Sequence, residues 1–161
     1  MVENEKLRNL MLAIAGHPRV KSLGLTKLWK LIYFVDVTAL RDLGATITGS
    51  EFVKYPHGPV PSRGEKVLQK LRREELIETK QEAIGPYTQT SVTAIGHPDM
   101  GIFTAAERVI IERICRDLGG KSAKQLSDIS HAEPAWTLAA DLQALDPELM
   151  FYGRAEDLEG L

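Results

Sequence analysis

The feature that most constrains the fold of this chain is a long apolar stretch over residues 26–44. Its apolar residues recur at intervals of three and four, which is the spacing of one face of a helix. Further apolar residues fall on the other side, and a helix that is apolar nearly all round is buried by its neighbours. Gly44 is a suitable end because glycine adopts the left-handed conformation without steric penalty. We therefore predict a central core helix, with Thr26 as its N-cap, against which the other elements pack.

Asp36 interrupts this apolar pattern and lies on the same helix face as Trp29, Ile32 and Leu40. A buried carboxylate costs free energy unless it is paired or hydrogen-bonded. We favour a structural carboxylate that accepts hydrogen bonds from backbone amides of the next loop or from an arginine or lysine. The alternative is a catalytic acid or base, but no second carboxylate or histidine stands at a telling spacing from it.

The composition is that of an ordinary globular protein. The 161 residues suffice for one domain, which we expect at residues 1–153, followed by an acidic mobile tail at residues 154–161. A net charge of −2 gives no general attraction to nucleic acid or anionic lipid. The single cysteine excludes an internal disulfide and favours a reducing compartment. The acidic start indicates no signal peptide, and no apolar run is long enough to span a bilayer, so we expect a cytoplasmic protein.

Prolines and glycines shape the middle of the chain. After a short amphipathic helix at residues 5–15 and the core helix, residues 51–55 are typical of a strand. That strand enters a loop in which three prolines and one glycine, at residues 56–61, fix a single backbone shape. Ser62 and Glu65 then match a capping box at the start of a helix.

The next segment favours two strands joined by a tight turn. Residues 76–79 and 87–95 have strand composition, and Gly85 with Pro86 supplies the turn. Helix, strand, turn and strand in this order are typical of a winged helix.

The C-terminal half is predicted to be helical. Two more capping boxes pair Thr104 with Glu107 and Ser122 with Gln125. Ser130 or His131 is expected at a helix start, Pro134 in the first turn of a helix that continues to residue 145, and Asp146 at the start of a last short turn. The predicted fold is therefore mainly α with a small antiparallel β-sheet (α+β), in a single compact domain of five to seven helices around a buried central helix.

No pattern in the sequence indicates catalysis or metal binding. Cys115 lies in an apolar helix, where a small buried side chain is more common than a nucleophile. The four histidines show no metal-ligand spacing, and no phosphate-binding or dinucleotide motif occurs. We interpret His131 and Trp136 as a structural junction rather than a catalytic pair. We predict no metal and no cofactor.

Several of these residues occur together in a known family. The helix at residues 27–36, the glycines after it, the loop at residues 55–62 and the junction before Trp136 resemble the SocA-like antitoxin family, also called the Panacea domain. The resemblance covers roughly residues 7–142. The signature positions that it carries over are Lys27, Tyr33, Asp36, Gly49, Pro61, Ser62, Ser130, His131 and Trp136.

The resemblance implies a binding protein with no enzymatic activity and no cofactor. Members resemble antitoxins of two-gene modules, each of which neutralises a cognate protein toxin encoded by the adjacent gene. One route is direct sequestration, and the type member is described as an adaptor that delivers its toxin to a ClpXP-type protease. From the residues, we expect the partner surface at the stiff loop, where the candidate residues are Tyr55, His57, Gly58, Pro59 and Val60.

Two other classes remain open from the sequence. The first is a winged-helix-like transcriptional regulator that binds DNA through residues 62–73 and 76–95. Antitoxins often repress their own operon, so this interpretation can coexist with the antitoxin one. The basic residues of that helix alternate with glutamates, so a solvated, salt-bridged face is favoured over a DNA-binding face. The second is an enzyme built around Asp36 and His131, which requires the two side chains within hydrogen-bond reach of each other.

Overall fold

The computed structural model describes residues 2–152, so the tail expected at residues 154–161 lies outside the described residues. Over the described part, the chain forms seven α-helices, one short 3-10 helix and two small antiparallel two-stranded sheets, which confirms the predicted α+β class. The elements in chain order are α1 (Val2–Ala15), α2 (Leu25–Leu43), β1 (Phe52–Tyr55), β2 (Gly58–Pro61), α3 (Gly64–Arg73), β3 (Ile77–Ile84), β4 (Tyr87–Ala94), η1 (Met100–Ile102), α4 (Ala105–Leu118), α5 (Ala123–His131), α6 (Pro134–Thr137) and α7 (Pro147–Tyr152). Two separate hairpins therefore stand in place of the one predicted sheet.

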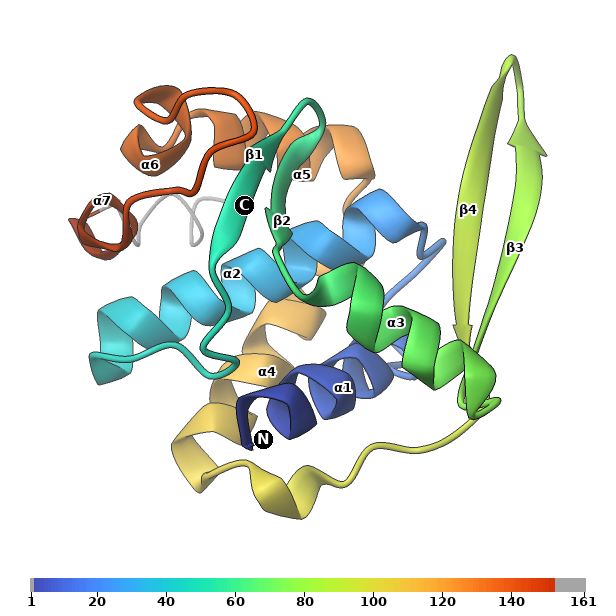
Figure 1. Ribbon diagram of the computed structural model, residues 1–161. Coiled ribbons are helices and arrows are strands. Elements are labelled where there is room, and N and C mark those ends of the chain that lie inside the picture. The colour runs from blue at the N-terminus through green and yellow to red at the C-terminus, as the bar shows by residue number, and fades with distance from the viewer. Residues whose placement is uncertain (1, 153–161) are drawn as a thin grey trace.

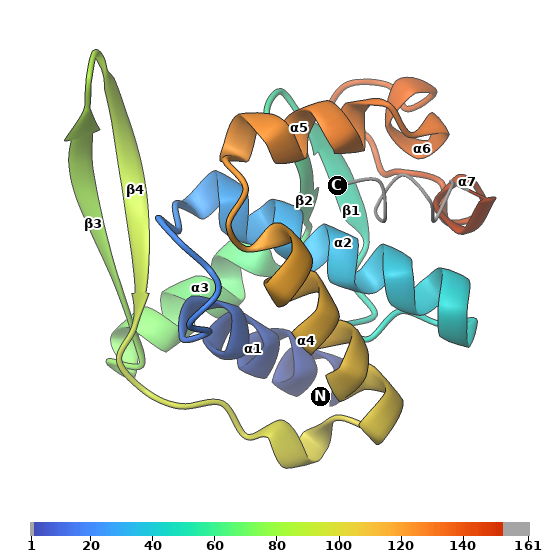
Figure 2. The ribbon, with the colours of Figure 1, turned by 180° about the vertical axis from the view of Figure 1, so that it is seen from behind.

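Helix α2 is the central helix that the apolar stretch predicts. Every residue from Lys27 to Ala39 is buried, and α1, β2, α4, α5 and α7 all contact the helix. Figures 1 and 2 show it crossing the middle of the molecule from both sides. Gly44 ends the helix as predicted, with φ of 85° and its N–H bonded to the carbonyl of Leu40. The predicted N-cap is wrong: the helix begins one residue before Thr26, with Gly24 at the N-cap and no side-chain cap.

The predicted proline-rich loop is in fact half of a β-hairpin. Strand β2 pairs with β1 so that Pro59 lies opposite Lys54 and Pro61 opposite Phe52. Opposed residues in an antiparallel pair alternate between hydrogen-bonded and non-hydrogen-bonded, and a proline has no N–H to give. Because Pro59 and Pro61 are two residues apart, both occupy positions that are not hydrogen-bonded to β1, and the strand keeps its pairing.

The same hairpin explains why the helix predicted through residue 145 is wrong. Helix α6 ends at Thr137, and residues 142–145 run along the free edge of β1. The Lys54 N–H donates to the Gln143 carbonyl at 2.9 Å, and the Leu145 N–H donates to the Phe52 carbonyl at 2.8 Å. Those backbone groups serve the strand and are not available to a helix.

Helix α3 begins without the predicted capping box. The Ser62 N–H still bonds to the Glu51 carbonyl as part of the hairpin, so Arg63 becomes the N-cap and no side chain caps the helix. Gly64 opens α3 against the ring of Trp29, where a β-carbon would lie only 2.8 Å from a ring carbon. The close packing of α3 on α2 therefore depends on a residue without a side chain.

The hairpin of β3 and β4 projects away from the helical body (Figure 1). It is longer than predicted, because β3 continues to Ile84 before the turn at Gly85, whose φ is 57°. Its base is fixed by a hydrogen bond from the Val92 N–H to the Leu23 carbonyl, while most residues toward its tip are exposed.

The C-terminal helices follow the predicted caps more closely. Thr104 with Glu107 and Ser122 with Gln125 both form complete capping boxes, and Pro134 occupies the first turn of α6. His131, however, is the last residue of α5 and not the first of a helix. No helix among residues 2–152 is long and apolar enough to cross a membrane.

Candidate functional site

The tip of the β1–β2 hairpin and the N-terminal half of α2 enclose a pocket of about 350 Å³. All five residues predicted at the partner surface line it, together with residues from α2 and the start of α3. Tyr55 and His57 are exposed at its mouth, Val60 is half-buried, and Gly58 and Pro59 form its buried floor. The structure thus brings the predicted residues together in one concave surface; their role in binding a partner stays a prediction.

The hairpin tip is held in place from two sides. The Ser127 hydroxyl of α5 donates to the His57 carbonyl at 3.1 Å. On the other edge, the Lys54 ammonium group donates to the carbonyls of Trp136 and Ala139 at 3.0 and 3.2 Å and lies 4.8 Å from the centre of the Trp136 ring. A surface fixed in this way loses little conformational entropy when it binds.

Lys30 is the site residue that sequence reasoning missed. It projects from α2 into this pocket and is only 1 % exposed. Burial lowers the pKa of its ammonium group to about 8. No hydrogen bond or ion pair joins that group to another residue of the described chain. The sequence did carry a signal, because a lysine inside a helix that is buried all round must account for its charge just as Asp36 must.

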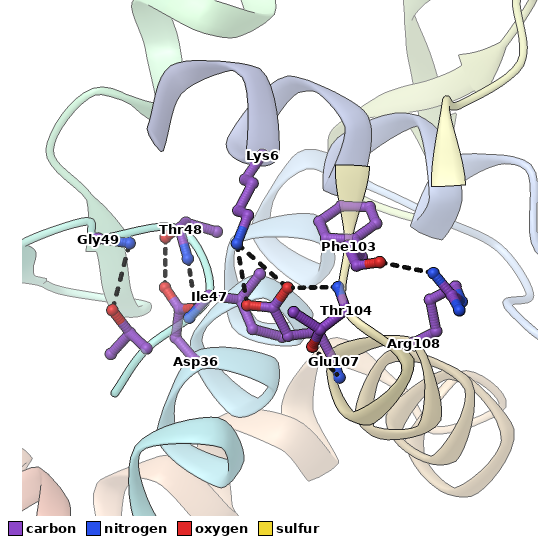
Figure 3. A network of polar contacts seen from close by, with 10 residues as sticks. Lys6, Asp36, Ile47, Thr48, Gly49, Phe103, Thr104, Glu107 and Arg108 are labelled. Atoms are coloured by element: carbon purple, nitrogen blue, oxygen red, sulfur yellow. Dashed lines mark hydrogen bonds and ion pairs between the residues drawn. The ribbon is translucent and has the colours of Figure 1, made fainter. Parts of the chain in front are cut away.

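Asp36 is the structural carboxylate that the sequence favours. Its side chain is fully buried, and one oxygen accepts the N–H groups of Ile47 and Thr48 at 2.9 and 3.0 Å (Figure 3). The other oxygen accepts the Thr48 hydroxyl. Burial raises the pKa of this carboxyl to about 6 despite these three hydrogen bonds. Asp36 therefore fixes the loop that leads from α2 to β1.

Glu107 lies beyond this cluster and adds a smaller electrostatic contribution to the raised pKa of Asp36. Its carboxylate caps α4 through the Thr104 N–H and pairs with Lys6 of α1 at 3.1 Å (Figure 3). The first turn of α4 is thereby tied to α1.

A second buried carboxylate joins α2 to the C-terminal helices. Glu133, which is 1 % exposed, accepts the Tyr33 hydroxyl at 2.7 Å and pairs with the Arg41 guanidinium at 2.8 Å. Arg41 also donates to the Met150 carbonyl at 2.8 Å. The raised pKa of the Tyr33 hydroxyl follows first from burial and then from the Glu133 carboxylate. Tyr33 thus holds the fold together, and neither Glu133 nor Arg41 was singled out from the sequence.

The remaining signature positions are also used within the fold. The buried Lys27 ammonium group donates to the Lys21 and Gly119 carbonyls at 2.5 and 2.6 Å and so fixes the C-terminal end of α4. Gly49 adopts a φ of 66°, and its N–H donates to the Thr46 hydroxyl at 3.2 Å. The Ser130 hydroxyl donates to the Ser127 carbonyl at 3.1 Å within α5.

His131 and Trp136 form the junction that the sequence predicts. Their rings stack at a centroid distance of 4.1 Å with only 4° between the planes. Burial lowers the pKa of His131, and the nearby positive charge of Lys30 lowers it further. The buried Nε2 of His131 has no hydrogen-bond partner among the described residues.

The structure does not assemble the catalytic pair that was kept as an alternative. The hydrogen bonds of Asp36 all go to the loop at residues 47–48, whereas His131 stacks on Trp136. Cys115 is fully buried, and burial raises the pKa of its thiol to about 12, as expected of a core residue. Among residues 2–152, no three histidine, cysteine, aspartate or glutamate side chains are grouped so as to hold a metal ion.

Comparison with known families identifies the class. The family model described as Antitoxin SocA-like, Panacea domain, matches residues 28–137, from the first turns of α2 to the end of α6. This match covers more than half of the chain, and the chain belongs to that family. A search of curated proteins gives no significant match. Family membership connects the chain with toxin–antitoxin systems.

Proposed function

We propose that this chain is the antitoxin of a toxin–antitoxin module and that it binds and neutralises a cognate protein toxin encoded by the adjacent gene. The observation that carries the proposal is the family match over residues 28–137, which includes most of α2, the β1–β2 hairpin and most of the pocket between them. The protein acts by binding, not as an enzyme.

The division of labour among the signature residues supports a binding role. Asp36, Tyr33 and Lys27 use their polar groups inside the fold, so they build a scaffold. Tyr55, which is 45 % exposed, and His57 stand at the mouth of the pocket on a fixed hairpin. Partly exposed aromatic side chains on a rigid surface are favoured anchors at protein interfaces.

Neutralisation can follow two routes, and they make different demands on the chain. Sequestration needs one surface that covers the toxin. An adaptor needs a second surface for a ClpX-type unfoldase, so that toxin and protease are held at once. The routes separate in cells that lack the unfoldase, where a sequestering antitoxin still rescues growth and an adaptor does not.

Co-expression with the adjacent open reading frame tests the proposal. Growth is scored with the neighbour alone and with both proteins, and the tagged chain is recovered for mass spectrometry. We expect the neighbour to be toxic alone, to be harmless together with this chain, and to co-purify with it. A harmless neighbour that does not co-purify would contradict the proposal.

A DNA-binding regulator is the second candidate, and one observation favours it. Helix α3 is followed directly by the exposed hairpin of β3 and β4, the order of a recognition helix and its wing. The charges on and next to α3 argue against DNA binding, because exposed Glu74 pairs with Arg8 at 2.6 Å and Glu65 lies among the basic residues. A gel shift with upstream DNA over a salt series tests it, since binding dominated by phosphate contacts weakens steeply with salt.

A further inference from the structure

Lys30 presents a charge that the described chain does not neutralise. Its side chain is 1 % exposed, yet its ammonium group has neither hydrogen bond nor ion pair within residues 2–152. Lys27, one helical turn earlier, is comparably buried but donates to two carbonyls. An ammonium group that is partly desolvated and has no acceptor in the protein costs free energy. Because Lys30 lines an open pocket, an acceptor can reach it from outside.

The walls of that pocket fit a single carboxylate on an apolar segment. Trp29, Tyr55, Pro59 and Val60 surround the approach to Lys30, Glu65 is the one acidic residue of the described lining, and the pocket holds about 350 Å³. The backbone of Gly58 lies directly over the lysine: a β-carbon there would be 3.0 Å from the Lys30 Cε, and its φ is 141°. A larger residue at this position would fill the space above the ammonium group.

A longer groove continues from this pocket and carries the same sign of charge. It holds about 850 Å³ and shares Lys30 and His57 with the pocket. Its described lining contains five lysines, Lys21, Lys27, Lys30, Lys121 and Lys124, and no aspartate or glutamate, although Lys124 pairs with Asp128 at 3.1 Å and Lys27 donates to two carbonyls. Residues of α2, α5 and the β3–β4 hairpin line the groove. Figures 1 and 2 show α5 and this hairpin on either side of the N-terminal end of α2. At its far end Tyr87 is 76 % exposed and Ile84 is 49 % exposed.

We propose that an acidic, extended segment of the partner protein binds along this groove and places one carboxylate in the pocket on Lys30. The proposal rests on the proposed function in taking the partner to be a protein toxin. Lys30, which has no partner within residues 2–152, and the exposed Lys21 complement aspartates or glutamates of such a segment, and the exposed Tyr87 and Ile84 add apolar contact area. A protein segment fits better than nucleic acid because the pocket is narrow and walled by apolar side chains, and the whole chain carries a net charge of −2.

The test compares three forms of the full chain in binding to the purified product of the adjacent gene: wild type, Lys30→Met and the control Lys66→Met, which removes an exposed lysine of α3 outside the groove. Lys30→Gln takes the place of the methionine variant if circular dichroism shows that the latter does not fold. We expect binding at least about tenfold weaker for the Lys30 variant and unchanged for the control. If Lys30 variants bind within twofold of wild type, the inference is wrong. Growth rescue and binding by wild type would in that case still support the proposed function.

If wild type does not bind the product of the adjacent gene, the proposed function is wrong. A second measurement then tests the carboxylate site independently. The nitrogen-15-labelled chain is titrated with acetyl-tetraglutamate amide, tetraglutamine and a short oligo(dT) strand. We expect saturable shifts of the Lys30 and Gly58 amides with tetraglutamate only, and their loss in Lys30→Met. Absent shifts, or larger shifts at these amides with oligo(dT), overturn the carboxylate site.

Discussion

Helix α2 buries two opposite charges six residues apart, and their surroundings differ completely. Asp36 has no exposed surface and receives three hydrogen bonds from residues 47 and 48. Lys30 is 1 % exposed and donates no hydrogen bond to the described chain. Buried polar groups are nearly always satisfied in a folded protein. The comparison therefore separates a charge that builds the fold from a charge that is kept for a ligand.

The physical difference lies in which element packs over each charge. The loop after Gly44 brings two backbone N–H groups and a hydroxyl to Asp36. The hairpin tip that covers Lys30 brings prolines, which have no N–H, and a glycine, and leaves open space above them. A charged group that the fold leaves without a partner, such as Lys30, is expected at a functional site.

Replacing Asp36 with alanine gives the largest expected loss of stability. Asp36→Ala leaves the buried N–H groups of Ile47 and Thr48 without an acceptor, so we expect the free energy of unfolding to fall by about 3 kcal/mol. Urea denaturation measures it. The control Asp36→Asn keeps one oxygen for both amides and should lose less than about 1 kcal/mol. Equal losses for alanine and asparagine would show that the hydrogen bonds do not carry the effect.

The second prediction uses the pH dependence of the same carboxyl. The pKa of Asp36 is about 6 in the folded protein and 3.8 in the reference state, so the folded state binds the proton more tightly. Its contribution to stability is then full below pH 3.8 and is lost as the pH rises through about 6. Relative to Asp36→Asn, wild type should lose about 2 kcal/mol between pH 4 and pH 7. Parallel stability curves for the two proteins over this range would contradict the raised pKa.

The contrast between the two charges also marks how far the sequence alone could lead. The apolar stretch predicts α2 and its end at Gly44, and the spacing of polar residues predicts two of the three capping boxes, because these are local effects. The third box, at Ser62, fails because the serine is still committed to the hairpin through Glu51. Pairing between distant segments decided that outcome, and no local pattern reports it.

The site divides in the same way. The stiff tip with Tyr55 and His57 could be predicted, since prolines and glycines act on their own neighbourhood. The pocket could not be predicted, because it forms only when the hairpin folds back over α2 and Lys30. Glu133 was missed for the same reason: its partners Tyr33 and Arg41 are 100 and 92 residues away in the sequence.

The third prediction concerns Lys30 and has the opposite sign from the first. Lys30→Met removes a buried charge that the described chain does not pair and keeps the apolar stem, so we expect the free energy of unfolding at pH 7 to rise by about 1 kcal/mol. Thermal and urea denaturation of the isolated chain measure this change. A loss of more than about 1 kcal/mol would mean that Lys30 is structurally paired and would remove the contrast with Asp36.

The smallest expected effect on stability belongs to the hairpin tip. Replacing Tyr55 and His57 together with alanine removes two exposed side chains that make no side-chain hydrogen bond within residues 2–152, so the free energy of unfolding should change by less than about 0.5 kcal/mol. Affinity for the adjacent gene's product should nevertheless fall at least about tenfold, because truncating an aromatic anchor at an interface costs more than 1 kcal/mol. Affinity is measured by calorimetry beside the unfolding curves.

A comparison for this pair is available on the other hairpin. Tyr87→Ala removes an even more exposed tyrosine, at the tip of β3 and β4, which lines the groove but not the pocket, so a smaller loss of binding is expected from it. If the Tyr55 and His57 variant folds and binds as wild type while Tyr87→Ala weakens binding, the partner surface lies on the projecting hairpin. The pocket beside α2 then loses its claim as the site of recognition, and the unpaired charge of Lys30 must be explained without a partner protein.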